Sequence, residues 1–66
     1  MPNYAVTVPT FRVNFFSRRT VANQFMHRHA TREAVLWEWD AADRCWYHYA
    51  YDDAGDRYVV EKKLSL

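Results

Sequence analysis

The fold is decided by residues 35–64, which read VLWEWDAADRCWYHYAYDDAGDRYVVEKKL. Two runs in this stretch, 35–39 and 45–51, are rich in β-branched and aromatic residues, which favour strands, and residues 57–64 are expected to form the last strand. The polar segment before this last strand holds Gly55, the only glycine of the chain, which suits a loop position with positive φ. Short connections of this kind join antiparallel strands, so the stretch predicts a three-stranded meander.

One part of this stretch has an alternative interpretation. Residues 33–42 contain Glu, Ala and Leu, which are good helix formers, so a helix is the competing prediction there. Trp37 and Trp39 lie two residues apart, which is the period of a strand, and we therefore expect a strand.

Residues 18–30 are expected to form the one helix of the protein, with Ser17 as its N-cap. The apolar residues of this segment recur at helical spacing and make one stripe: Val21, Ala22, Phe25, Met26 and His29. A strand is the competing interpretation, because several of these residues are also acceptable in strands.

The first 16 residues contain two alternating apolar runs, residues 4–8 and 11–15. The parity of the alternation changes across Pro9-Thr10, which indicates a bend or bulge. We expect the first strand at residues 10–16 and a flexible or bent N-terminal strand within residues 1–9. The predicted fold is a single α+β domain, residues 1–66, of order β-α-β-β-β, with one helix packed on a small antiparallel sheet that ends in the meander.

The net charge of +1 conceals an asymmetry along the sequence. Residues 1–32 contain five arginines and no acid, which gives +5. Residues 33–56 contain seven acids and one arginine, which gives −6. Such asymmetry suggests an interaction role. Mutual neutralisation of the basic helix and the acidic turns within the fold is the alternative.

Large aromatics fall on both faces of the strand predicted at residues 45–51, and one helix can cover only one face. Exposed apolar patches usually mark interaction sites, and Tyr and Trp concentrate binding energy. The alternative is that the aromatics fill the core of a small domain. The residues predicted to bind a partner are Trp37, Trp39, Trp46, Tyr47 and Tyr49 on the sheet, and Arg18, Arg19 and Arg28 on the helix.

No motif of the sequence indicates catalysis, a metal or another cofactor. The three histidines and Cys45 match no zinc-site spacing, and the aspartates lack the pattern of a calcium loop. One glycine cannot build a phosphate-binding loop. We therefore expect neither an enzyme nor a cofactor. The lone cysteine, with no signal peptide or membrane span in the sequence, predicts a cytoplasmic protein that does not associate with membranes.

These observations predict a small protein-binding module that acts stoichiometrically on a larger protein or protein–nucleic acid complex. In size and style alone, the protein resembles the small proteins with which phages inhibit host machinery, such as anti-CRISPR proteins. A homodimer would be another way to cover the second aromatic face. Direct nucleic-acid binding by the arginines and the sheet aromatics is the alternative function, which the acids of the sheet segment disfavour.

Overall fold

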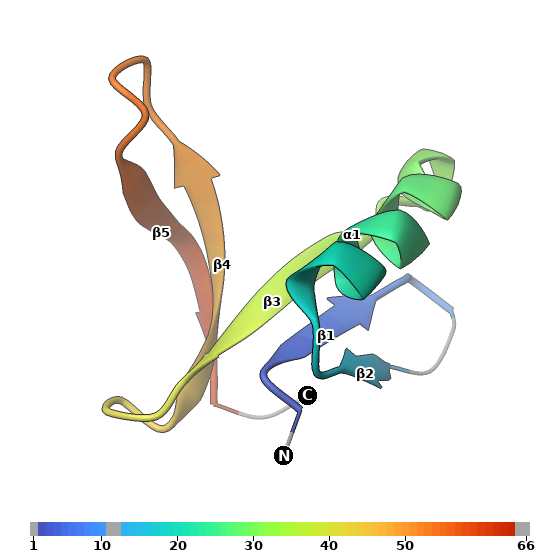
Figure 1. Cartoon of the computed structure of the whole chain (residues 1–66), viewed down its shortest axis with the longest axis horizontal. Helices are drawn as coiled ribbons and strands as arrows, with labels where there is room; N and C mark the ends of the chain where they lie inside the picture. The colour runs from blue at the N-terminus through green and yellow to red at the C-terminus, as the bar shows by residue number, and fades with distance from the viewer. Residues whose placement is uncertain (1, 11–12, 65–66) are drawn as a thin grey trace.

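The structure is a computed structural model that describes residues 2–10 and 13–64. Its strands form one antiparallel sheet in the order β2-β1-β3-β4-β5, and the single α-helix packs on the β2-β1-β3 part of it (Figure 1). The elements are β1 (Tyr4–Thr7), β2 (Asn14–Phe16), α1 (Arg19–Arg28), the 3-10 helix η1 (Ala30–Arg32), β3 (Val35–Asp40), β4 (Cys45–Tyr51) and β5 (Arg57–Lys63).

This architecture confirms the predicted fold class and the C-terminal meander β3-β4-β5. Residues 35–40 are a strand, so the helical alternative for residues 33–42 is wrong. The helix lies within the predicted residues 18–30, and a strand there is excluded. The N-cap, however, is Arg18 and not Ser17, and the first turn receives no capping hydrogen bond from a side chain.

The N-terminal segment contributes more to the sheet than the sequence indicated. Residues 4–7 form β1, which lies between β2 and β3 and pairs with both. The strand predicted at residues 10–16 is confined to β2, and Phe11 and Arg12 lie outside the described residues. Thr10 has φ of 71°, so the parity change at Pro9-Thr10 marks a reversal of direction between two paired strands.

The core consists of two clusters, one on each face of the sheet. The first lies beneath α1 and is centred on Val6, Val8 and Ala22. The second lies on the opposite face and is centred on Ala5, Trp37 and Trp46. Alternate residues of β1 therefore serve opposite clusters, as the period of two requires.

The two polar connections of the meander are stabilised by aspartates. The Asp40 carboxylate accepts a hydrogen bond from the backbone N–H of Asp43 at 2.8 Å. The Asp52 carboxylate accepts from the N–H groups of Ala54 and Asp56 at 3.0 and 2.9 Å. Gly55 has φ of 86°, which confirms the predicted positive-φ position. These side chains act as turn formers, in line with the sequence interpretation.

Candidate functional site

The five aromatics predicted to bind a partner lie on two opposite faces of the sheet. Trp39 lies opposite Trp46, whereas Tyr47 lies opposite Glu38, which contacts the helix residue Arg19. The tryptophans therefore share the face away from α1, and Tyr47 and Tyr49 share the face on the side of α1. The five residues cannot form one continuous patch.

Their exposure also differs from the prediction. Trp37 is 1% exposed, Tyr47 8% and Trp46 9%, so the expectation that these rings face solvent is wrong. Trp39 and Tyr49 are half-buried. For the buried three, the alternative interpretation that aromatics fill the core of this small domain is the correct one.

The second face is covered without a second layer of helices. The Trp46 ring packs against Phe15 and Trp39, with ring centroids 5.8 and 5.3 Å apart. The indole N–H of Trp37 donates to the Thr7 hydroxyl at 2.8 Å, and the Lys63 ammonium lies 5.0 Å from the Trp37 ring. Side chains of the sheet itself, together with Val13 ahead of β2, thus close the face that the helix leaves open.

Apart from Phe15 and Val21, the large apolar side chains that are exposed among the described residues lie on or next to the β4–β5 hairpin. This hairpin extends beyond the part of the sheet that α1 covers (Figure 1). All seven residues of β5 are exposed. We call the following set the hairpin surface: Tyr51, Tyr58, Val59, Val60 and Leu64. Residues 57–64 were predicted as a strand, which is β5, but this set was not among the predicted site residues. The signal was present in the Tyr58-Val59-Val60 run of the last strand.

The outer edge of β5 pairs with no other strand in the described part of the protein. The Asp52 N–H donates to the Asp56 carbonyl at 2.9 Å, and Tyr49 lies opposite Val59 in the same register. Hydrogen-bonded and non-hydrogen-bonded pairs alternate along an antiparallel ladder. Asp52 and Asp56 form a hydrogen-bonded pair, so Arg57 and Val59 belong to non-hydrogen-bonded pairs with β4. Their backbone N–H and C=O groups therefore point away from β4, toward the free edge.

The three predicted arginines do not converge. Arg18 and Arg28 are exposed and lie at opposite ends of α1, about 15 Å apart at 1.5 Å of rise per residue. Arg19 is half-buried and points to the sheet, where it lines a cleft between α1 and strands β3 and β4. Of the predicted helix residues, only Arg19 therefore belongs to a structured site.

An ion-pair network connects α1 to the hairpin across this cleft. Arg19 Nη1 lies 3.3 Å from Glu38 Oε1, and Arg57 Nη1 lies 3.5 Å from the same oxygen. Arg19 Nη2 donates to the Tyr51 hydroxyl at 2.9 Å, and the Arg57 guanidinium lies 4.2 Å from the centre of the Tyr49 ring. The Tyr51 hydrogen bond and the Glu38 carboxylate raise the pKa of Arg19, which keeps this guanidinium charged.

A second polar contact is located at the other end of β4. The Tyr47 hydroxyl donates to the Asp43 carboxylate, which belongs to the turn between β3 and β4. This hydrogen bond raises the pKa of Tyr47 above its usual value, because ionisation of the phenol would lose the donor. Tyr47 therefore anchors the turn and is not available as a surface group.

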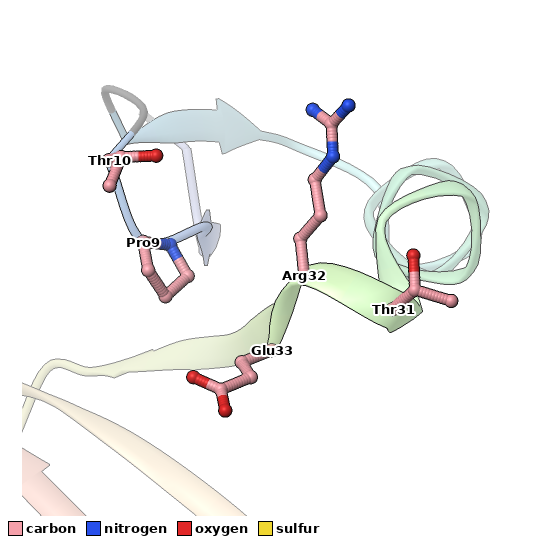
Figure 2. A pocket seen from close by; sticks show the side chains of 5 residues that line it. All are labelled: Pro9, Thr10, Thr31, Arg32 and Glu33. Atoms are coloured by element: carbon pink, nitrogen blue, oxygen red, sulfur yellow. The ribbon is translucent and has the colours of Figure 1, made fainter.

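A larger hollow lies where the β1–β2 connection meets the segment from η1 to β3 (Figure 2). Its volume is about 520 Å³, and its lining residues are Pro9, Thr10, Thr31, Arg32 and Glu33, all of them exposed. The Arg32 and Glu33 side chains point in opposite directions in Figure 2. The polar groups of this hollow do not converge on one point, so we do not treat it as the functional site.

Possible metal ligands and membrane-spanning helices were sought in residues 2–10 and 13–64. No group of three or more His, Cys, Asp or Glu side chains is placed to hold a metal ion in this part of the protein. No helix among the same residues is long and apolar enough to cross a membrane.

Comparisons with known proteins identify no relative. The sequence matches no protein-family model and no curated protein, and the fold matches no solved structure. The hairpin and the cleft beside it are therefore the features of the protein from which a function can be inferred.

Proposed function

We propose that this protein is a small protein-binding module, not an enzyme, and that it binds a larger partner stoichiometrically through the β4–β5 hairpin. The observation that carries the proposal is the unpaired, solvent-exposed edge of β5 with apolar side chains around it. Exposed apolar patches and unpaired strand edges are both common interaction sites.

The distribution of the hairpin surface favours an edge-on approach of the partner. Val59 lies opposite Tyr49 and Tyr58 opposite Ala50, so the side chains of Val59 and Tyr58 lie on opposite faces of the hairpin. A partner that lay flat on one face would contact only one of them. A strand added along the edge of β5 contacts both and also pairs with the free N–H and C=O groups of Arg57 and Val59.

A strand of a larger protein fits this edge better than a second copy of the same protein. A bulge interrupts the β4–β5 register beside His48 and Tyr49, and Glu61, Lys62 and Lys63 follow it on β5. Bulges and charged residues are devices that prevent identical edges from pairing. Arg57 and Lys62 also lie on the same face of β5. If two copies paired antiparallel about Val59, Arg57 of one copy would lie opposite Lys62 of the other across the bulge, and these like charges would repel each other.

The decisive experiment compares Val59→Pro with Val59→Ala. Proline removes the free-edge N–H of Val59 without removing a β4–β5 hydrogen bond, whereas alanine shortens the side chain and keeps the N–H. A protein captured from lysate is purified, and its affinity for each variant is measured by calorimetry after circular dichroism has verified folding. If Val59→Pro does not fold, Val59→Asp takes its place, because a charge at the edge also opposes strand addition.

We expect a 1:1 complex with the wild type. Val59→Pro should lose about tenfold or more in affinity, because one main-chain hydrogen bond contributes about that much, and Val59→Ala should lose less. Equal affinities for the wild type and Val59→Pro, or for Val59→Asp in its place, would refute strand addition. A self-association constant that falls with Val59→Pro would show instead that the edge serves a homodimer. Inhibition of the partner, as in the phage proteins that this protein resembles in size, stays a prediction.

Direct nucleic-acid binding is the second candidate function, and one observation favours it. Arg18, Arg28 and Arg32 are exposed, and residues 1–32 contain no acid that would repel phosphates. A gel-shift titration at low salt tests this candidate. If nucleic acid is the ligand, affinity should fall steeply with added salt. The slope of log affinity against log salt concentration should be shallower by about one unit for Arg28→Gln than for the wild type. Absence of a shift at low salt would exclude this candidate.

A further inference from the structure

The cleft between α1 and the hairpin is the right size for a single side chain. Its volume is about 170 Å³, well below the roughly 300 Å³ at which pockets for small molecules and cofactors begin. The lining residues are Arg19, Asn23 and Met26 on α1, Leu36 and Glu38 on β3, and His48, Tyr49 and Tyr51 on β4. The group that enters this cleft is therefore no larger than a single side chain or a chain terminus.

The charges at the cleft leave a positive excess. Two guanidinium groups, Arg19 and Arg57, share a single oxygen of the Glu38 carboxylate, so the three groups sum to +1. The arginine side chains are 40% and 50% exposed, whereas the Glu38 side chain is 16% exposed. An incoming group would thus meet the arginines, whose remaining N–H groups can donate, more readily than the carboxylate.

Hydrogen-bond donors from both α1 and β4 also line the cleft. The Tyr51 hydroxyl accepts from Arg19, which leaves its own proton to donate elsewhere. The Asn23 amide lies one helical turn after Arg19 on the same side of α1. Met26, Leu36 and Tyr49, which also line the cleft, supply apolar wall that suits a hydrocarbon stem. Donors with a positive charge beside an apolar wall match a carboxylate on a short hydrocarbon stem.

We infer that this cleft binds a carboxylate presented by a protein segment. Arg19 is the principal ligand, Arg57 and Tyr51 assist it, and Glu38 holds the two guanidiniums in place while competing with the incoming anion. The same chemistry is offered by an Asp or Glu side chain and by the C-terminus of a polypeptide. The inference rests on the proposed function only for the origin of that segment, because carboxylate binding itself can be measured with the isolated protein.

The test uses three peptides and nuclear magnetic resonance of the ¹⁵N-labelled protein. Acetyl-Leu-Glu-Leu-amide has its carboxylate on the Glu side group, acetyl-Leu-Gln-Leu-amide is its neutral match, and acetyl-Leu-Gln-Leu with a free C-terminus carries a terminal carboxylate. We expect saturable shifts of the Arg19 and Arg57 Nε–H signals with at least one charged peptide, at a dissociation constant of about 1 mM, and none with the neutral peptide. The charged peptide that binds more tightly identifies the source of the carboxylate.

Three variants separate a specific site from general attraction. Arg19→Gln should weaken the binding of the charged peptide about tenfold, whereas Arg28→Gln, which removes an exposed arginine near the end of α1, should leave it unchanged. Glu38→Gln should strengthen binding severalfold, because it removes the competing negative charge and leaves the net charge of the cleft at +2. A purely structural role of Glu38 would not give tighter binding.

Several results would overturn the inference. They are equal shifts with the neutral peptide, no shift of the arginine signals up to about 20 mM of either charged peptide, and equal losses for Arg19→Gln and Arg28→Gln. The Val59→Pro comparison measures a different contact on the outer edge of the hairpin. Failure of carboxylate binding would therefore leave the edge proposal standing, and failure of strand addition would leave the cleft in place.

Discussion

Replacing Trp37 by alanine should unfold a large share of the protein, although the sequence suggested Trp37 as a partner-binding residue. Trp37 is the largest fully buried residue among those described and belongs to the core cluster on the face away from α1. Its removal opens a cavity in this cluster, which α1 does not cover. The effect should therefore appear as lost stability, not as lost affinity in an otherwise intact fold.

The expected magnitude is comparable to the whole stability of the domain. Truncating a buried Trp to Ala costs about 3–5 kcal/mol. A protein of 66 residues has a free energy of unfolding of about 3–10 kcal/mol at 0.05–0.15 kcal/mol per residue. Trp37→Phe keeps most of the ring but loses the hydrogen bond to Thr7, so we expect a smaller cost of about 1–2 kcal/mol.

Urea unfolding followed by far-ultraviolet circular dichroism measures these free energies without relying on tryptophan fluorescence, which the substitutions change. Tyr58→Ala is the matched control, because Tyr58 is exposed and its loss should change stability by less than about 0.5 kcal/mol. Equal stabilities of Trp37→Ala and Tyr58→Ala would refute the reasoning. The Trp37 ring would then be free to bind a partner, as the sequence analysis expected.

Two further sets of substitutions test the turns of the meander. Gly55→Ala should lower the free energy of unfolding by about 1 kcal/mol from backbone strain alone, because Gly55 has φ of 86° and an added Cβ would meet nothing within 4 Å. Arg44 has φ of 53°, so Arg44→Gly should raise the free energy of unfolding by about 0.5–1 kcal/mol. If Gly55→Ala and Arg44→Gly shift the urea midpoint in the same direction, this reasoning is wrong. A third substitution tests the hydrogen bond from Tyr47 to Asp43, which raises the pKa of the Tyr47 hydroxyl. Above pH 10.0, the usual pKa of tyrosine, the folded protein therefore keeps a proton that the unfolded protein releases. The stabilisation from this bond is present below pH 10 and is lost as the pH rises through the pKa of the folded state. Tyr47→Phe should therefore make the free energy of unfolding fall less steeply between about pH 8 and pH 11. An unchanged slope would speak against the bond.

Sequence patterns located nearly every element of the fold. The spacing of Trp37 and Trp39 indicated β3, the density of aromatic residues indicated β4, the loop around Gly55 set the start of β5, and the apolar stripe indicated α1. The N-cap was missed because Ser17 is a strong capping residue by type, yet the helix begins one residue later and without a capping side group. The contribution of the interior strand β1 was underestimated from the sequence, because a proline and a parity change follow it within three residues.

The candidate site was predicted only in part. Arg19 and Tyr49 are on the walls of the cleft, but Glu38 and Tyr51, which complete it, were not among the predicted site residues. Arg57 was also absent from that set, because its contact with Glu38 spans 19 residues and depends on how the hairpin curves. Ion pairs between distant segments have no local signature in a single sequence.

The order of residues along each strand determined which of them share a face, and the sequence alone therefore specified the strands, the turns and the two-sided aromatic pattern. Only the tertiary structure decided which face is covered, because coverage depends on the twist of the sheet and on what lies above each position. Trp37 and Trp46 are thus buried by Phe15, Trp39 and Val13, while the edge of β5 stays open because the sheet ends there.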